Sequence, residues 1–452
     1  MIDRPGSPTL QAPTPHLWAV LRRQARVVLL LCVVVIMAMT LAWSSTGSAT
    51  KPSLVPFVPT LKLGADLTQV SADPWRSAPA VSSAQQVLSQ AVTYVEQPIM
   101  GWGVDNPEPS PGVFDWASLD RRVAFIESTG ATPVITLAGA PDWMKGGQAG
   151  TTDWSRINDA PTPAHFQAFA QLAAMIAERY PEVHYFQVWS ELKGFWDQTT
   201  NTWNAARYTH LYNDVYEAVR AVAPTAQIGG PYVTIDTWGD PSAGGYPSSL
   251  SGAWGTIDQR SLDAISYWLS HAVGAEFLSV DGGLQPRGGP LPTNPAAATA
   301  MFAQVDDWLR AQTTLPIWWS EFYVGMPGVR GHSAEWLSLA TSALLQILSS
   351  GAQTAMLWDP ERYRGSHSPA LWTSTSSPEG GQATGLASVF DLITHDLEPG
   401  HTATLVGPPG TQLLVDGATT LAVNATDEPV VVGPPGRTLT LSPFEVLTQP
   451  GT

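Results

Sequence analysis

Between residues 61 and about 361, short apolar runs alternate with longer amphipathic stretches. The short runs predict buried strands, and the longer ones have the spacing of helices with one apolar face. The predicted strands are Leu61–Leu67, Ile99–Val104, Pro133–Ala138, Tyr185–Trp189, Gln227–Gly230, Phe277–Val280, Ile317–Ser320 and Thr354–Trp358. The predicted helices are Ser82–Tyr94, Trp116–Ser128, Pro163–Arg179, Ala205–Val222, Gln259–Ser270, Pro295–Gln312 and Glu335–Ser349. This alternation is typical of βα units around a parallel sheet.

Eight predicted strands with helices between them favour a (β/α)8 barrel, the TIM-barrel fold, over residues 61–395. A doubly wound open sheet is the alternative, but no Gly-rich phosphate-binding turn follows the first strand. From residue 396 to 452 the pattern changes to short alternating runs separated by Asp-Gly, Pro-Pro-Gly and Asn/Asp turns. This change predicts a small C-terminal β-sandwich as an accessory domain.

The N-terminal region contains an uncharged apolar run, Val27–Trp43, directly after Arg22, Arg23 and Arg26. Its length is at the lower edge of a membrane span, and its basic flank is expected to stay in the cytoplasm. We therefore predict a disordered cytoplasmic tail over residues 1–21, a transmembrane signal-anchor helix over 22–43 and a linker over 44–60. This arrangement predicts a single-pass protein of the cell membrane with its barrel outside. A cleaved signal and a secreted protein are the alternative, because residues 47–49 are small.

Composition excludes several classes of function. The formal net charge is −16 and no basic stripe is present, so binding to nucleic acid is disfavoured. The single cysteine, Cys32, lies in the apolar run, which excludes an intramolecular disulfide and argues against a catalytic thiol. The histidines show no metal-ligating spacing, and neither a P-loop nor a Gly-x-Ser-x-Gly elbow occurs. We therefore expect no metal and no cofactor.

Two strand ends carry glutamates in similar surroundings. Glu191 follows Trp189-Ser190 at the end of the fourth predicted strand, and Glu321 follows Trp319-Ser320 at the end of the seventh. Reactive groups of a (β/α)8 barrel lie at the carboxyl ends of its strands, so these two carboxylates are expected to converge. A pair of carboxylates is what glycosidic cleavage requires, one as general acid and the other as nucleophile or base. The alternative is that each glutamate pairs with a structural Arg or Lys.

These motifs resemble clan A glycoside hydrolases, and most closely family 39, which includes β-xylosidases and α-L-iduronidases. In that clan the acid/base Glu follows strand four in a Trp-Asn-Glu type motif, and the nucleophile Glu follows strand seven. The resemblance therefore implies Glu191 as acid/base, Glu321 as nucleophile and retention of anomeric configuration. Two positions depart from the family pattern. Ser190 stands where the family has Asn, and the sixth strand reads FLSVDGG without the usual His/Tyr motif.

Other polar and aromatic residues near strand ends are candidates for binding an oligo- or polysaccharide substrate. They are Trp102, Asp105, Asn106, Asp142, Trp143, Ser190, Trp196, Trp319, Tyr323 and Trp358. For the tryptophans, core packing is an equally good interpretation, although the flat indole also suits the apolar face of a sugar ring. The sequence thus predicts a retaining glycosidase acting on an extracellular glycan. The alternative is a surface glycan-binding protein on a glycosidase barrel that has lost its activity.

Overall fold

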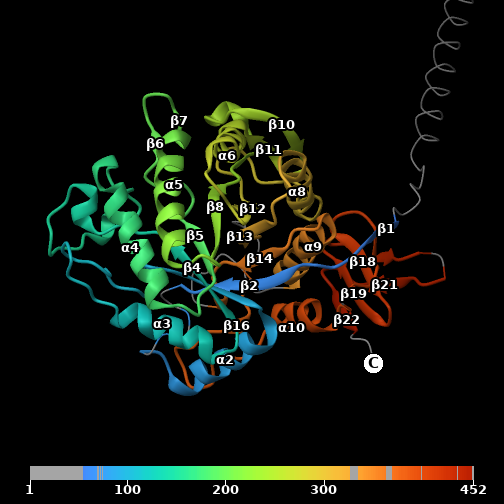
Figure 1. The fold of residues 1–452 in the computed structure, drawn as a ribbon. Helices are drawn as coiled ribbons and strands as arrows, with labels where there is room; N and C mark the ends of the chain where they lie inside the picture. Colours follow the sequence, from blue (N-terminus) through green and yellow to red (C-terminus); the bar gives the residue numbers. More distant parts are fainter. Residues whose placement is uncertain are drawn as a thin grey trace, which may run out of the picture. The chain divides into compact units, whose positions relative to one another are not determined.

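Eight parallel strands form a closed barrel in the computed structural model, which describes residues 54–68, 71, 73, 75–325, 334–362, 369–398, 400–434 and 436–449 (Figure 1). The barrel strands are β2 (Lys62–Asp66), β3 (Tyr94–Pro98), β4 (Thr132–Leu137), β5 (Tyr185–Val188), β8 (Gln227–Thr234), β12 (Phe277–Gly283), β13 (Ile317–Tyr323) and β14 (Thr354–Leu357). The last strand, β14, pairs in parallel with the first, β2. This closure confirms the (β/α)8 prediction and excludes the open sheet.

Helices connect the barrel strands and cover the barrel with their apolar faces. They are α2 (Ala78–Ala91), α3 (Ala117–Ser128), α4 (Phe166–Arg179), α5 (Ala205–Val222), α6 (Gln259–His271), α7 (Pro295–Ala298), α8 (Ala300–Gln312), α9 (Ala334–Ser350) and, after β14, α10 (Gly385–Asp391). In α4, for example, Phe166, Phe169, Ala173 and Ile176 are buried, which is the spacing of one helical face. The boundaries of most helices lie close to the predicted ones.

The second barrel strand lies earlier in the chain than predicted. The apolar run Ile99–Val104 was expected to be this strand, but β3 ends at Pro98 and the run forms the loop that follows. Within this loop, the side chains of Ile99, Met100 and Val104 are buried. The run is therefore apolar because it packs against the core, and not because it forms a strand. Tyr94, predicted as the end of a helix, is the first residue of β3. Trp102 therefore lies in the loop that follows β3.

The C-terminal region forms an antiparallel sheet of β1 (Leu54–Phe57), β17 (Ala403–Val406), β18 (Thr411–Asp416), β19 (Thr419–Asn424) and β22 (Val446–Gln449). A two-stranded hairpin of β20 (Val430–Val432) and β21 (Leu439–Leu441) shares a small apolar core with it. The same sheet contacts α9, whose residues are buried on every face as a result. β1 comes from the segment predicted to be a linker. A separate sandwich domain is therefore not confirmed, because this sheet belongs to the same compact unit as the barrel.

Small elements that the sequence pattern did not indicate extend the loops around the barrel. They are β6 (Trp196–Asp197), β7 (Thr202–Trp203), β9 (Thr237–Trp238), β10 (Pro247–Gly252), β11 (Gly255–Asp258), β15 (Glu361–Arg362), β16 (Trp372–Thr373) and the short helices η1 (Asp142–Lys145) and η2 (Trp154–Arg156). The predicted tail and transmembrane helix, residues 1–43, lie outside the described residues. Among the described residues, no helix is both long enough and apolar enough to cross a membrane.

Candidate active site

Glu191 and Glu321 converge at the carboxyl ends of their strands. Glu191 follows β5, and Glu321 lies near the end of β13. Asp281 of β12 joins them, since the parallel register pairs it directly with Glu321. Carboxylate oxygens of the three residues lie within 4.8 Å of one another. Asp281 and Glu321 are buried, whereas the side chain of Glu191 is partly exposed. We call these three residues the carboxylate cluster.

The backbone around Glu191 adopts an unusual conformation. Trp189, Glu191 and Leu192 have φ values of 69°, 51° and 49°, in the left-handed region that non-glycine residues seldom adopt. The conformation is held in place because the Trp189 indole donates a 2.7 Å hydrogen bond to the carbonyl of Lys193. Strain of this kind tends to collect where a side chain must be aimed at a ligand. Here the strained backbone directs the Glu191 side chain toward Asp281 and Glu321.

Lys193 brings a positive charge to the cluster. Its Nζ lies 2.5 Å from Oε1 of Glu191 and 5.6 Å from the centre of the Trp102 ring. The structural alternative considered for Glu191, an ion pair with a basic residue, is thus present. This ion pair is at the barrel mouth beside two further carboxylates, so it belongs to the site itself.

Beneath the cluster, a chain of buried hydrogen bonds crosses the barrel interior. Ser320 donates to the Gln187 side chain, Gln187 donates to Thr136 at 3.1 Å, and Thr136 donates to Glu96. Beside this chain, the Tyr232 hydroxyl donates to Oε2 of Glu321 at 3.4 Å. Thr234 donates to Asp281 at 3.1 Å. These contacts hold the two buried carboxylates in fixed orientations.

The electrostatics of the cluster favour bound protons. Burial raises the pKa of Glu321 well above its usual range, and the charges of Asp281 and Glu191 raise it further. Burial and the charge of Glu191 likewise raise the pKa of Asp281. Lys193 acts in the opposite direction on the pKa of both residues. Desolvation and crowding of like charges are the two physical causes, and both are common at catalytic sites.

Four of the predicted substrate-binding residues lie near the cluster. Ser190 adjoins Glu191, and Tyr323 follows Glu321 by two residues at the end of β13. The charge of Asp281 and burial raise the pKa of Tyr323. Trp102 contacts Lys193, and its ring centre lies 6.4 Å from that of Trp358. These four positions are consistent with substrate contact, as is the exposed Asp105 in the same loop as Trp102.

Other predicted binding residues have structural partners. Trp319 is fully buried between β13 and α8, where its indole donates a 2.9 Å hydrogen bond to Asp306, so it is a core residue. The Asn106 amide donates a hydrogen bond to Thr152 in the loop after β4 and accepts one from the backbone N–H of Glu108. The Trp143 indole donates to the carbonyl of Glu108.

The remaining two predicted residues also make contacts within the protein. Asp142 is buried, pairs with Lys145 and accepts a hydrogen bond from the backbone of Asp153. Trp196 contacts Trp203 in the β6–β7 hairpin and lies under the Arg260 guanidinium. Asp142 therefore supports a loop, and Trp196 stabilises a hairpin.

The sequence pattern indicated no role for Asp281 or Tyr232. For Asp281 a signal existed, since it directly follows the predicted strand Phe277–Val280. Tyr232 gave no usable signal because the strand was predicted to end at Gly230, four residues before β8 ends at Thr234, and Pro231 follows. Three carboxylates at this spacing could also coordinate a hard cation such as Ca²⁺ or Mg²⁺. The expectation of no metal therefore stays a prediction.

Solved structures with this fold include several glycoside hydrolases. A monomeric β-xylosidase from Caulobacter crescentus CB15 matches with a TM-score of 0.54 and 14% identity, over 81% of this chain and 74% of that one. The GH39 enzyme from Xanthomonas axonopodis pv. citri matches with a TM-score of 0.53 and 17% identity, over 83% and 75%. A glucosidase from Croceicoccus marinus matches with a TM-score of 0.51 and 14% identity, over 83% and 78%. The fold is that of known glycoside hydrolases.

At these identities the likeness concerns the fold alone. It confirms the resemblance to family 39 structures that the strand-end motifs indicated. No protein-family model matches the sequence, and no curated protein matches it. What this barrel does must therefore be argued from the carboxylate cluster.

Proposed function

We propose that this protein is a retaining glycoside hydrolase that cleaves O-glycosidic bonds of an extracellular glycan, with β-xylosides as the first substrates to test. The observation that carries the proposal is the convergence of Glu191 and Glu321 at the barrel mouth, with carboxylate oxygens within 4.8 Å. Retaining enzymes hold their two carboxyl groups about 5–5.5 Å apart, and inverting enzymes about 6.5–9.5 Å apart. The spacing supports the retaining mechanism.

In this mechanism the Glu321 carboxylate attacks the anomeric carbon while Glu191 gives its proton to the departing oxygen. The bond to the leaving group breaks as a covalent glycosyl-enzyme ester forms. In the second step Glu191 takes a proton from water, the water oxygen attacks the same carbon, and Glu321 is released. Two inversions at one carbon leave the anomeric configuration unchanged.

The first step needs a charged Glu321 and a protonated Glu191. Burial and the neighbouring carboxylates raise the pKa of Glu321, whereas the Lys193 ammonium lowers it. The same ammonium forms the ion pair with Glu191, so one cation interacts with both carboxylates.

The deciding experiment is a panel of 4-nitrophenyl glycosides, β-xyloside, β-glucoside and β-mannoside included, assayed with the wild-type chain and with Glu321→Gln. We expect release of nitrophenol from at least one glycoside and its loss in the variant. Proton NMR of the first-formed sugar should show the anomer of the substrate. Turnover that persists in Glu321→Gln would refute the assigned nucleophile. Saturable binding of glycans without turnover would instead support the glycan-binding alternative.

A further inference from the structure

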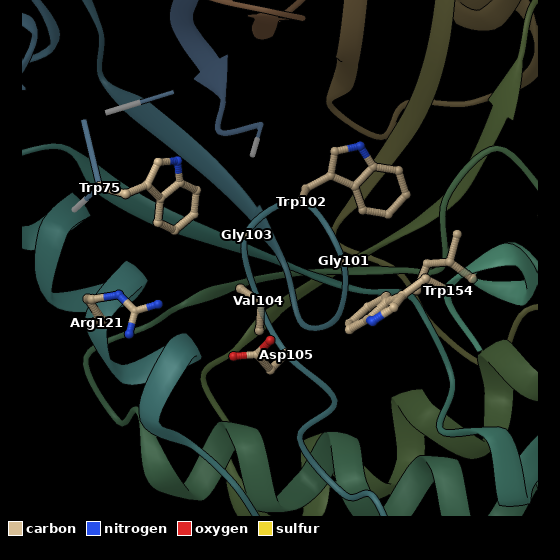
Figure 2. Close-up of a pocket in the computed structure, with 9 residues that line it drawn as sticks. Trp75, Gly101, Trp102, Gly103, Val104, Asp105, Arg121 and Trp154 are labelled. Atoms are coloured by element: carbon tan, nitrogen blue, oxygen red, sulfur yellow. The ribbon is translucent and has the colours of Figure 1, made fainter. Parts of the chain in front are cut away.

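A cavity opens beside the Trp102 loop. It has a volume of about 450 Å³ and is lined by Trp75, Trp102, Trp154, Asp105 and Arg121, together with the loop backbone at 101–104 and Ile157 (Figure 2). Figure 2 shows the three indoles and the two charged side chains surrounding it. Trp102 connects the cavity to the candidate active site, because its ring also contacts Lys193, the ion-pair partner of Glu191.

Two of the tryptophans that line this cavity are unusually exposed for a residue type that is normally buried. Trp75 is 64% exposed and Trp154 is 47% exposed. Exposed tryptophans gathered around one hollow are typical of binding sites, since a rigid indole offers a large apolar area at little entropic cost. Neither Trp75 nor Trp154 was among the residues that the sequence pointed to.

Each loop that carries one of these tryptophans is held by a buried ion pair. Arg76, next to Trp75, pairs with Glu361 at 2.5 Å. Under the Trp102 loop, Arg122 pairs with Asp73 at 2.7 Å and donates a 3.0 Å hydrogen bond to the carbonyl of Trp102.

The third loop begins at η2, where Trp154 follows Asp153. Asp142 accepts from the backbone of Asp153, while Lys145 pairs with Asp142 and donates to the carbonyl of Arg156. Buried ion pairs contribute little net stability, but they hold geometry. Three of them around one hollow indicate a preorganised site.

The backbone of the Trp102 loop turns the Trp102 side chain outward. Gly101, Trp102 and Gly103 have φ values of 82°, 49° and 92°, a run in the left-handed region that favours glycine at both flanking positions. A Cβ on Gly103 would lie 1.5 Å from the Arg122 guanidinium, so only glycine fits there. The backbone therefore approaches Arg122 closely and turns the indole of Trp102 outward between the cavity and Lys193.

The polar lining indicates an uncharged ligand rich in hydroxyl groups. The Arg121 guanidinium and the Asp105 carboxylate face this cavity, and neither side chain bonds or pairs with another described residue. Arg121 offers only hydrogen-bond donors and Asp105 only acceptors, whereas a sugar hydroxyl is both. Their charges cancel, which removes any general preference for anions or cations.

We propose that this cavity is a second sugar-binding subsite. One sugar of a glycan chain lies at the carboxylate cluster, and a neighbouring neutral pyranose of the same chain stacks in the cavity. The inference rests on the proposed function for the link to that reacting sugar. It makes the protein selective for chains of two or more sugars, because a single aryl glycoside leaves the cavity empty. Trp75 and Trp154 are the stacking residues, and Arg121 and Asp105 bind the ring hydroxyls.

The test is calorimetric binding of β-1,4-xylo-oligosaccharides and β-1,4-gluco-oligosaccharides of one to five sugars to the full-length chain carrying Glu321→Gln, which prevents hydrolysis. Affinity should rise with chain length and then level off. Adding Trp75→Ala or Trp154→Ala should weaken binding of the longest chain about tenfold, the cost of removing a central aromatic contact, and leave the monosaccharide unaffected. Tyr246→Ala, an aromatic residue 49% exposed elsewhere, is the matched control.

Both tryptophans are largely exposed, so their removal should leave the thermal midpoint of unfolding unchanged, which separates loss of binding from loss of fold. Affinity that does not change with length in either series, or tryptophan variants that bind like the parent, would overturn the inference. Turnover of aryl glycosides with such a result would leave the proposed function intact. Conversely, binding that strengthens with chain length in the parent and is lost in both tryptophan variants would support the subsite. If no aryl glycoside were turned over as well, the proposed hydrolase activity would be refuted.

Discussion

Glu191 and Glu321 occupy different surroundings, and this difference bears on their roles. Glu191 is partly exposed and paired with Lys193, whereas Glu321 is buried and bonded by Tyr232. The proposed mechanism uses Glu321 as the nucleophile and Glu191 as the acid/base. Chemical rescue tests these two roles separately, because each role gives a different product.

Azide rescue separates the two roles. Glu321→Ala should abolish turnover of every glycoside, because no covalent intermediate can form. Glu191→Ala should lose about 10²–10⁴-fold on poor leaving groups, the usual contribution of general acid catalysis. Azide needs no general base, so it should restore turnover in Glu191→Ala and give a glycosyl azide with the anomeric configuration of the substrate. The same azide with Glu321→Ala should give the opposite anomer. Exchanged outcomes would exchange the two roles.

The crowding of carboxylates predicts how the pH profile responds to single charges. Glu321 must be ionised to attack, so activity is lost as pH falls through its pKa. Asp281 raises the pKa of Glu321 and Lys193 lowers it. The acidic limb of kcat/KM should therefore move to lower pH in Asp281→Asn and to higher pH in Lys193→Gln. Asp263→Asn, which removes an exposed carboxylate on α6, should move nothing. Shifts of equal sign in the first two variants would contradict this account.

At the level of elements, strand positions were largely predictable and side-chain directions were not. Alternation along β13 would place Trp319 and Glu321 on the same face, toward the substrate. Instead, the register with β12 shifts at Ser320, pairing Val280 with Trp319 and then Asp281 with Glu321. This irregularity turns Trp319 toward α8 while Glu321 faces the barrel mouth. A single sequence carries no signal for such a bulge, so it could place Glu321 near the strand end but could not decide between the core and the substrate side for Trp319.

The contact between β13 and α8 gives a prediction about stability. Burial raises the pKa of Asp306 to about 7, from an ordinary value of 3.8. Between these pH values the folded chain holds a proton that the unfolded chain has lost, so stability falls as pH rises through this window. Asp306→Asn keeps an oxygen for the Trp319 indole and removes the buried charge. It should raise the free energy of unfolding by up to about 4 kcal/mol above pH 7 and have little effect near pH 4.

Denaturant unfolding at pH 4, 6 and 8 measures this difference. Asp307→Asn is the matched control, because Asp307 is the exposed neighbour on the same helix. A gain in stability that is the same at all three pH values would mean that charge at Asp306 is not the cause. A loss at pH 8 would mean that the ionised carboxylate stabilises the contact between β13 and α8.

For the whole molecule, the strand-end motifs predicted the barrel and the two glutamates but not the arrangement of the C-terminal region. The alternating runs after residue 396 correctly indicated β-strands, yet they could not show that β1 would join them or that α9 would cover their sheet. Both contacts are between segments far apart in the chain, and local patterns do not encode such pairings. The same limit applies to the cavity beside the Trp102 loop, which three separate loops and helix α3 build.

Membrane topology is the remaining prediction at this scale, and it concerns residues 22–43, which lie outside the described residues. The arginines that precede the apolar run should stay in the cytoplasm and direct the folded part outside. Protease added to intact cells should therefore remove a tag placed after Thr452 and spare a tag placed before Met1, while permeabilised cells should lose both. A mature chain that begins near Thr50 would show instead that the segment is a cleaved signal. Protection of both tags in intact cells would place the barrel inside, where an extracellular glycan could not reach Glu191 and Glu321.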